Sequence, residues 1–450
     1  MSEHLELCIL AAGKGSRMKS NKPKVLQELA GKPLISHLLE TGKSLKPKKI
    51  HLVIGAGGEQ IQTRFSDSGL NFVEQAEQLG TGHAVQQLIP YLNGGRVLIL
   101  LGDAPLVSKD SLERLIAEDC DLGVLSVDHP NPFNYGRILR DETGVQAIIE
   151  ERDANDEIKT ISEINTGVMV ADATQLVGWL TQLSAENDQG EFLLTDIVSI
   201  ARSEGRRVVA IKAKDHREVQ GVNTFAQLAE LEQYYQAMAA SQLLNDGVQI
   251  VDPARFTLRG ELVAGQDVFI DVNCIIEGKV KLGDGVRIGA NTVIKDATIG
   301  PGSVIKPFSH VEGATMESDC AAGPFARLRP GTYFEDNVAV GNFVEVKKSR
   351  LGVGSKASHL SYIGDAVLGQ SVNIGAGTIT CNYDGVNKHV TNIEDGVFVG
   401  TNTSLVAPVT LGEWSTIAAG STITSNVPAR SLGVGRGKQR NIEGWKGPRD

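Results

Sequence analysis

Short apolar runs alternate with amphipathic segments through about the first 222 residues of the chain. Apolar runs of strand length occupy residues 5–12, 50–54, 97–101 and 122–127. Helical spacing marks residues 33–45, 82–92 and 108–117, and shorter runs at 136–140, 145–150 and 165–170 indicate added strands that carry a substrate lobe. The alternation predicts an α/β domain of Rossmann-like type, in which right-handed βαβ units form a mostly parallel, covered sheet.

Residues 224–244 have the pattern of one long helix. Their apolar side chains recur every three or four residues, at Phe225, Leu228, Leu231, Tyr235 and Met238. Thr224 and Gln227 form a capping box at the start, and Asn-Asp-Gly at 245–247 ends the pattern. About twenty helical residues span about 30 Å, which is enough to separate two domains. We therefore predict three parts: residues 1–225, a helical linker at 226–246, and residues 247–450.

After about residue 250 the aliphatic residues recur with a period of six. The first run is Ile270, Ile276, Leu282, Ile288 and Ile294, and the second is Ile393, Val399, Leu405, Leu411, Ile417 and Ile423. Neither a helix nor a plain strand has this period. A left-handed parallel β-helix of hexapeptide repeats does, because each of its three faces takes six residues and turns one aliphatic side chain inward, about 18 residues per coil. An ordinary β-rich domain with accidental spacing is the alternative.

Composition supports a thin, repetitive core. Glycine accounts for 50 of the 450 residues and aromatic residues for only 5%, as expected where small aliphatic side chains fill a narrow prism. The segment TITCNYDGVNKHVT breaks the repeat between Ile374 and Ile393, and it is either a neutral loop or a functional excursion. The tail after Pro428 is basic and rich in glycine, and its simplest interpretation is a frayed terminus.

Charge and cysteine content restrict the class of protein. The 44 basic and 54 acidic residues give a net charge of −10, which argues against nucleic acid as a general partner but allows local phosphate pockets. The five scattered cysteines lack CxxC spacing and favour a reducing compartment. No run approaches the ~20 apolar residues of a membrane span, and Glu3 and Glu6 stand where a signal peptide carries basic residues. We expect a cytoplasmic protein without membrane contact.

A candidate phosphate-binding loop follows the first apolar run. It reads LAAGKGSRM at residues 10–18, with KPK at 22–24. Gly13 and Gly15 allow the backbone to approach an anion, and Lys14, Arg17 and Lys24 add positive charge. The loop is neither Walker A nor GxGxxG, since GK[ST] is absent and Met18 stands at the third glycine position.

A carboxylate follows another apolar run. Asp103 lies in LLGDAP at 100–105, at the carboxyl end of a predicted strand, where open α/β sheets bind ligands and where Asp suits Mg²⁺. With the loop at 10–24, this segment resembles the signature of nucleoside-diphosphate-sugar pyrophosphorylases, which join a sugar 1-phosphate to a nucleoside triphosphate. Further matching pieces are Gln75, LGT at 79–81, YGR at 135–137, Glu150, NTG at 165–167 and GVN at 221–223.

Together with the hexapeptide region, the chain resembles over essentially its full length the family of bifunctional N-acetylglucosamine-1-phosphate uridyltransferases and glucosamine-1-phosphate N-acetyltransferases. The resemblance implies that the nucleotide sugar contacts Leu10, Ala11, Ala12, Gly13, Lys24, Gln75, Gly80, Thr81, Leu101 and Gly102. It places N-acetylglucosamine against Gly136, Glu150 and Asn165, and Mg²⁺ on Asp103 and Asn223. Taken alone, Asn223 could instead cap the following helix, and Gly136 could be an ordinary turn glycine.

The implied reaction of the first half is attack of N-acetylglucosamine 1-phosphate on the α-phosphorus of UTP, with release of pyrophosphate. No protein nucleophile is needed, so the catalyst positions two anions and offsets their repulsion. That repulsion is about 4 kcal/mol for two unit charges at 4 Å and an effective dielectric constant of 20. We expect a bound cation, Arg17 and Lys24 to supply the opposing charge.

Acetyl transfer to an amine needs a base, and histidine, with an ordinary pKa near ~6.5, is suited to this task. The repeat region contains His310, His359 and His389, which could instead bind zinc, although their spacing contains no close ligand pair. His359 lies in GSKASHLSYIGD at 354–365, which resembles the acetyltransferase half of the family, where the matching histidine is the general base.

The same resemblance implies the remaining contacts of that half. Glucosamine 1-phosphate would contact Arg329, Lys347, Tyr362 and Asn373, and acetyl-CoA would contact Ala376, Asn382, Tyr383, Thr401, Ala419 and Arg436. Direct transfer is expected, since none of the five cysteines has an evident histidine partner.

Assembly and function leave alternatives open. Outward-facing apolar residues on a narrow β-helix predict a homotrimer, with acetyl-transfer sites at the junctions between chains. A pyrophosphorylase with a single activity and a regulatory β-helix is one alternative. A β-helix that serves only as an oligomerisation scaffold is another.

Overall fold

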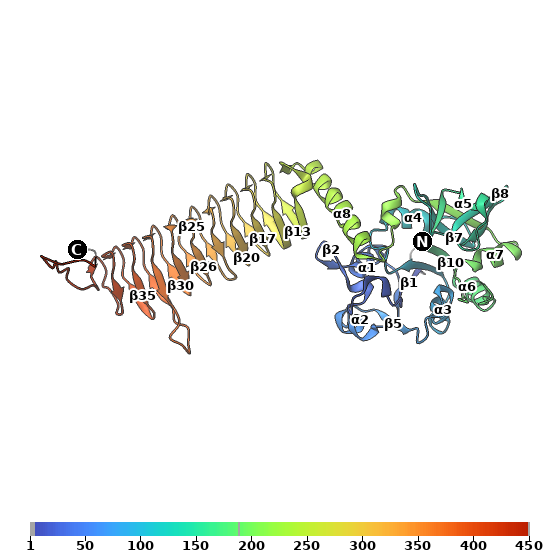
Figure 1. Cartoon of the computed structure of the whole chain (residues 1–450), viewed down its shortest axis with the longest axis horizontal. Helices are drawn as coiled ribbons and strands as arrows, with labels where there is room; N and C mark the ends of the chain where they lie inside the picture. Colours follow the sequence, from blue (N-terminus) through green and yellow to red (C-terminus); the bar gives the residue numbers. More distant parts are fainter. Residues whose placement is uncertain (1–4, 188–189, 449–450) are drawn as a thin grey trace. The chain divides into compact units, whose positions relative to one another are not determined.

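The computed structural model describes residues 5–187 and 190–448 (Figure 1). The chain divides into two compact units, Met1–Tyr234 and Tyr235–Asp450. The strands of the first unit are β1 (Leu5–Ala11), β2 (Glu28–Leu29), β3 (Lys32–Pro33), β4 (Lys49–Ile54), β5 (Asn71–Glu74), β6 (Arg96–Leu101), β7 (Leu122–Asp128), β8 (Arg137–Asp141), β9 (Gly144–Ile149), β10 (Glu163–Asp172) and β11 (Val208–Lys212). Its helices are α1 (Leu34–Ser44), α2 (Gly58–Arg64), α3 (Thr81–Gln86), α4 (Lys109–Ala117), α5 (Asp156–Lys159), α6 (Ala173–Leu180) and α7 (Asp196–Ser203).

The first unit contains the predicted, mostly parallel sheet. Its strand order is β11-β7-β10-β6-β1-β4-β5, with the hairpin β8–β9 attached to β10. β1 pairs in parallel with β4 and β6, and β7 pairs in parallel with β11. Residues 165–170, which the pattern assigns to an added lobe, belong instead to β10 in the middle of the sheet, antiparallel to β6 and β7. The pattern does not mark β5 and β11, because these short edge strands are only partly buried.

Helices cover both faces of this sheet. Leu7 of β1 packs in one core cluster with Leu38 of α1, whereas the next residue, Cys8, packs in another with Leu176 of α6. A strand covered on both faces needs apolar residues at every position, which explains the continuous apolar runs. The predicted helix at 82–92 is α3 followed by a 3₁₀ turn at Ile89–Tyr91, because Pro90 has no amide hydrogen with which to extend an α-helix.

The predicted long helix is α8 (Phe225–Asn245). Thr224 Oγ1 accepts a hydrogen bond from the amide of Gln227 at 3.2 Å, so Thr224 caps the helix. The carboxamide oxygen of Gln227 accepts from the amide of Asn223 at 2.8 Å, one residue before the position that a capping box uses. The side chain of Asn223 is therefore not the helix cap.

The second unit is the predicted parallel β-helix. An eleven-stranded sheet forms one face: β12 (Gln249–Ile250), β14 (Phe269–Ile270), β16 (Arg287–Ile288), β19 (Val304–Ile305), β22 (Ala321–Ala322), β25 (Ala339–Asn342), β28 (Lys356–His359), β31 (Asn373–Ile374), β34 (Phe398–Val399), β37 (Thr416–Ile417) and β39 (Leu432–Gly433). A seventeen-stranded sheet, from β13 (Thr257–Ala264) to β38 (Thr422–Ile423), supplies the other two faces. Ile270 pairs with Ile288 and Ile288 with Ile305, so a coil takes 17 or 18 residues.

The aliphatic residues of both runs that repeat every six positions are buried and belong to one continuous core. Ile374 pairs directly with Val399, so the intervening insertion does not interrupt the stack. Part of it, between β32 (Ile379–Cys381) and β33 (Thr391–Ile393), projects as a loop (Figure 1). The tail is not simply frayed, because β39 pairs with β37 and extends the eleven-stranded face.

Within residues 5–187 and 190–448, no helix combines the length and apolar character needed to cross a membrane. The five cysteines are all free thiols.

Candidate functional sites

A cavity of about 290 Å³ opens at the carboxyl ends of β1 and β6. The predicted nucleotide-contacting residues in its lining are Leu10, Ala11, Ala12, Gly13, Lys24, Gln75, Gly80, Thr81, Leu101 and Asp103. Val25, Gln78, Ala84 and Glu191 also line it, although no sequence motif marks them. The cavity lies at the sheet edge where open α/β folds place their ligands.

A second cavity, of about 360 Å³, adjoins the first. Its lining includes the predicted residues Arg17, Gly136, Glu150, Asn165 and Asn223. Both cavities share Thr81, Leu101 and Asp103. Asp103 therefore lies where two ligands, one in each cavity, would meet.

Gly102 lines neither of these cavities. Its amide donates to the carbonyl of Leu10 at 2.9 Å, and a Cβ at this position would come within 2.7 Å of the same oxygen. The absence of a side chain at Gly102 thus lets the segment before Asp103 approach the end of β1.

Lys24 joins the two residues predicted to hold a metal ion. Its ammonium group contacts the carboxylate of Asp103 and donates to Asn223 Oδ1 at 3.0 Å. The side chains of Lys24 and Asp103 are only 12% and 19% exposed, so this contact is shielded from water. The oxygens of Asp103 and Asn223 therefore converge on one position that a cation can occupy.

The loop at Gly80 and Thr81 is fastened to a segment that sequence motifs do not mark. The amide of Gly82 donates to the carbonyl of Phe192 at 2.8 Å, and Thr81 Oγ1 accepts from the amide of Leu194 at 3.1 Å. Gly80 has φ +113°, and a Cβ there would lie 2.5 Å from the carbonyl oxygen of Phe192. The glycine is thus required both by its conformation and by the close approach of the two chains.

Glu150 is a partly buried carboxylate in the second cavity. Burial, with smaller contributions from Asp153 and Asp196, raises its pKa above the ordinary value. Thr195 opposes this shift by donating a hydrogen bond to Glu150 Oε1 at 3.2 Å. Thr195 also lines the cavity, so it belongs to the site although no motif indicates it.

In the second unit, His359 ends β28 and is exposed. Its Nδ1 lies 2.9 Å from Asn342 Oδ1, on the neighbouring coil. Because a carboxamide oxygen can only accept, Nδ1 carries the hydrogen and Nε2 of the neutral ring is left as the basic nitrogen. Asn342 therefore orients His359, the predicted base. The sequence around Asn342 gives no sign of this role.

A column of charged residues runs along one face of the β-helix. Arg259, Glu277, Lys295 and Glu312 occupy successive coils with alternating charge. Arg329 and Lys347 follow in the next two coils and break the alternation with two adjacent positive charges. Arg329 is paired with Glu345 at 2.8 Å. Such a concentration of positive charge favours a phosphate group.

Two of the predicted acceptor and acetyl-CoA residues, Tyr362 and Asn382, lie close together on the coils that follow Lys347. Asn382 is buried, contacts the Asp365 carboxylate, and lies 3.5 Å from the hydroxyl of Tyr362. Lys388 in the projecting loop is close enough to Lys347 that this second ammonium group lowers its pKa. Asn373 is not part of the cluster: it lies on the eleven-stranded face and pairs with Lys356.

Three predicted acetyl-CoA residues occupy equivalent positions in successive coils. Ala376, Thr401 and Ala419 each follow a strand of the eleven-stranded face by the same two residues. Arg436 donates to the carbonyl oxygen of Ala419 at 2.6 Å, which brings the basic tail to this column. Tyr383 lies apart, exposed in the projecting loop, with its hydroxyl donating to Gly385 O at 2.5 Å.

The zinc alternative finds no support. Across the described ranges 5–187 and 190–448, no three His, Cys, Asp or Glu side chains are grouped to hold a metal. His359 instead contacts Asn342, and His389 contacts Asp384 at 2.7 Å.

Family models match a different segment in each of the two units. Residues 7–159 match the family of MobA-like NTP transferase domains, and residues 265–296 and 391–425 match the bacterial transferase hexapeptide of six repeats. Among solved structures, the inositol-1-phosphate CTP transferase from T. maritima aligns with 51% of this chain and 96% of its own, at 17% identity and a TM-score of 0.41.

Full-length relatives carry the name Bifunctional protein GlmU. The relative from Marinobacter nauticus is 54% identical, and those from Azoarcus sp. and Stutzerimonas stutzeri are each 52% identical. Each comparison covers 99% of this chain and 99% of the relative. With a nucleotidyltransferase-type α/β half and a left-handed β-helix of hexapeptide repeats, the chain belongs to the family of bifunctional GlmU proteins.

Proposed function

We propose that this enzyme makes UDP-N-acetylglucosamine in two steps on one chain. The β-helix unit acetylates glucosamine 1-phosphate with acetyl-CoA, and the α/β unit then transfers UMP from UTP to N-acetylglucosamine 1-phosphate. The product feeds peptidoglycan and lipopolysaccharide precursor synthesis, as the family resemblance implies. The observation that carries the proposal is the pair of cavities that share Asp103, because uridyl transfer needs two ligands to meet at one point.

In uridyl transfer, the first cavity holds UTP and the second holds N-acetylglucosamine 1-phosphate. The sugar phosphate attacks the α-phosphorus in line, a bond forms to its phosphate oxygen, and pyrophosphate leaves. Lys24, shared between Asp103 and Asn223, and Arg17 of the second cavity offset the repulsion between the anions. Glu150 and Asn165 orient the sugar in its cavity.

Asp103 and Asn223 fit a Mg²⁺ ion. Their oxygens already converge on one cation, the ammonium group of Lys24, and both are hard oxygen ligands of the kind that Mg²⁺ prefers. An ion held there would neutralise charge on the phosphate oxygens.

In acetyl transfer, His359 Nε2 removes a proton from the amino group of glucosamine 1-phosphate. The amine then attacks the thioester carbonyl of acetyl-CoA, and the CoA thiol leaves. Arg329 and Lys347 hold the sugar phosphate, with Tyr362 and Asn373 completing the acceptor site. Ala376, Asn382, Tyr383, Thr401, Ala419 and Arg436 contact acetyl-CoA. Cys274 and Cys320 of the β-helix unit are buried with raised pKa values, which disfavours a thiol-bound intermediate on either of them.

We assign a homotrimer as the working form. Phe308, Phe325, Phe343 and Leu360 form an exposed apolar ladder on successive coils, and the first two phenyl rings are stacked with centroids 5.0 Å apart. Burial of this ladder between copies would remove a large apolar surface from water. Asn373 lies away from the Lys347 cluster within one chain, which supports acceptor sites completed by a neighbouring chain.

The functional division follows residues 1–225 for uridyl transfer, 226–246 for the helical linker and 247–450 for acetyl transfer. We place the protein in the cytoplasm, because five free thiols suit a reducing compartment.

One assay tests both activities. The protein is supplied with glucosamine 1-phosphate, acetyl-CoA, UTP and Mg²⁺, and free thiol and pyrophosphate are followed together. We expect thiol release first, then pyrophosphate. Release of thiol without pyrophosphate would show that the protein has only the acetyltransferase activity. Release of pyrophosphate from supplied N-acetylglucosamine 1-phosphate, without any release of thiol, would show that it has only the uridyltransferase activity.

A further inference from the structure

The hairpin β8–β9 carries two walls of the sugar cavity. Gly136 comes directly before β8, and Glu150 directly after β9. Among the described residues, the hairpin is paired with the main sheet only through Ile164 and Arg137, next to a hydrogen bond from the amide of Asn165 to the carbonyl of Gly136 at 2.8 Å. This narrow backbone connection leaves the angle between hairpin and sheet to be set by side chains.

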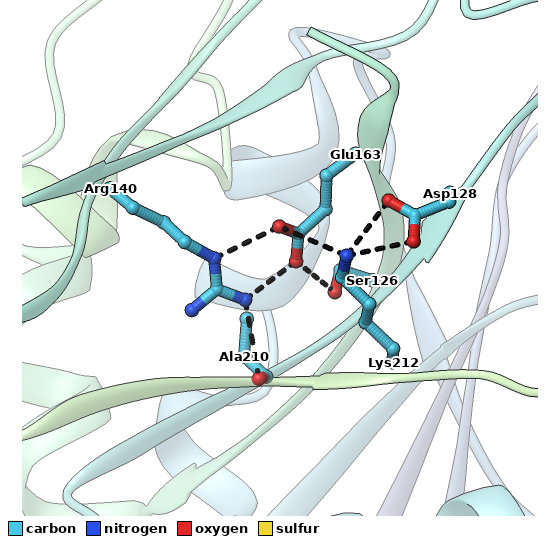
Figure 2. Close-up of polar contacts among 6 residues, drawn as sticks. All are labelled: Ser126, Asp128, Arg140, Glu163, Ala210 and Lys212. Carbon is cyan, nitrogen blue, oxygen red and sulfur yellow. Dashed lines mark hydrogen bonds and ion pairs between the residues drawn. The ribbon is translucent and has the colours of Figure 1, made fainter.

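A buried carboxylate bridges the hairpin and the sheet. Glu163 at the start of β10 has a side chain that is only 10% exposed. Arg140 of β8 donates to it twice, from Nε to Oε2 at 2.9 Å and from Nη2 to Oε1 at 2.6 Å (Figure 2). Ser126 of β7 donates to Oε1 at 2.6 Å.

The edge strand β11 completes the cluster. Lys212 bonds both carboxylate oxygens of Asp128 at 2.8 Å and lies 3.8 Å from Glu163, and Arg140 reaches the carbonyl of Ala210 at 3.5 Å (Figure 2). The two positive groups, on Arg140 and Lys212, and the two negative groups, on Glu163 and Asp128, thus balance in charge, and they come from the four strands β7, β8, β10 and β11. The two-point contact of a guanidinium with a carboxylate fixes direction as well as distance.

The Arg140–Glu163 contact lies close in sequence to residues that line the sugar cavity. Glu163 and Asn165 are two residues apart on β10, and Arg140 of β8 is four residues from Gly136, which directly precedes that strand. The register of β10 against β7 shifts between Asn165 and Met169, so the regular pairing that includes Glu163 ends at Asn165 and resumes beyond the irregularity. A change in the Arg140–Glu163 contact would therefore move Gly136, Glu150 and Asn165 relative to one another.

We propose that Arg140 and Glu163 form a positioning pair for uridyl transfer, which fixes the hairpin β8–β9 so that the sugar cavity matches N-acetylglucosamine 1-phosphate. The inference rests on the proposed function of the α/β unit. Neither side chain lines the sugar cavity, so the pair acts through the residues that do.

The test uses the full chain with Glu163→Gln. The variant keeps the size of the side chain but replaces one carboxylate oxygen with an NH₂ group. All three hydrogen bonds to Glu163 come from donors, on Arg140 and Ser126, so an NH₂ group cannot accept them. Pyrophosphate release is measured while each substrate is varied. We expect KM for N-acetylglucosamine 1-phosphate to rise about tenfold, with KM for UTP unchanged. Acetyl transfer by the same protein should also be unchanged, since it occurs in the other unit.

Arg140→Lys retains the charge but lacks the two-nitrogen contact, so the same rise in sugar KM is expected. The double variant should be no worse than the more impaired single variant, because both changes break one contact. Arg202→Ala is the matched control: it removes the 3.0 Å ion pair between Arg202 on α7 and Asp141 of the same hairpin, and it should leave both KM values unchanged.

Unchanged sugar KM in both Glu163→Gln and Arg140→Lys would overturn the positioning role. So would equal changes in both KM values, or a matching loss in Arg202→Ala, since these indicate general loosening of the unit. A wild-type protein that releases no pyrophosphate would refute the proposed function itself, and the two failures are thereby distinguished.

Discussion

Lys24 brings together three parts of the α/β unit that are far apart in sequence. Its ammonium group contacts Asp103, which follows β6, and Asn223, which precedes α8. This positive charge keeps the side-chain oxygens of Asp103 and Asn223 close together. In the proposed uridyl transfer, the same charge would offset the repulsion between the reacting phosphates. Lys24 thus connects the organisation of the site with its chemistry.

Lys24→Ala should therefore impair uridyl transfer selectively. We expect kcat/KM for pyrophosphate release to fall about 10²-fold, the typical cost of removing one group that stabilises transition-state charge. Thiol release from acetyl-CoA should be unaffected. Lys109→Ala, which removes an exposed lysine paired with Glu113 at 3.3 Å, is the control. Normal pyrophosphate release in Lys24→Ala would contradict the assigned role.

His359→Ala should strongly reduce acetyl transfer. Loss of a general base lowers the rate by about 10²–10⁴-fold, which thiol release would reveal. Asn342→Ala should give a smaller loss, because it frees the imidazole without removing it. Pyrophosphate release from supplied N-acetylglucosamine 1-phosphate should be normal in both. His310→Ala, an exposed histidine three coils earlier, serves as the control, and a similar loss there would argue against a special role for His359.

At the scale of elements, position in a strand or coil decides which side chains act together. The repeat places Ala376, Thr401 and Ala419 in one column, although they span more than forty residues of sequence. In the sheet, β10 lies between β6 and β7. It places Asn165 in the lining of the second cavity and Glu163 against Arg140 of the hairpin. Each element thus contributes a line of residues with a fixed spacing.

The Glu163 cluster makes a prediction about stability at low pH. Burial opposes ionisation of Glu163, but hydrogen bonds from Arg140 and Ser126 outweigh it and lower the pKa below the ordinary 4.5. A group with a lowered folded-state pKa contributes stability above its unfolded pKa and loses it as pH falls through the folded value. Calorimetry should find Glu163→Gln less stable than wild type at pH 7, with the difference shrinking below pH 4.5. A difference independent of pH would contradict this.

At the scale of the whole molecule, one chain carries two reactions in sequence. The acetyl group enters on the β-helix unit, and the acetylated sugar phosphate is the substrate of the α/β unit. The β-helix adds a surface suited to assembly: Phe308, Phe325 and Phe343 all have positive φ, which is uncommon for bulky residues, and present their rings to solvent. Such strained, exposed aromatic residues are explained if a neighbouring copy covers them.

Light scattering should therefore give about three times the mass of one chain. Phe325→Asn should lower that mass, because it removes the middle ring, stacked 5.3 Å from Phe343, while asparagine tolerates the φ of +55° well. The coil itself should stay folded, as circular dichroism would show. A monomeric mass for the wild type, or an unchanged assembly in Phe325→Asn, would argue against the ladder as the trimer contact.

The sequence by itself determined what depends on local spacing. The period of six specified the β-helix, because every coil repeats the same inward aliphatic position, and contiguous motifs such as LAAGKGSRM contain many of the residues that line the first cavity. Only the tertiary structure decided which distant polar residues meet: Asn342 with His359, Thr195 with Glu150, and Arg140 with Glu163. The physical reason is that strand order and register, which arise from packing of the whole core, bring these side chains together, and no short pattern records them.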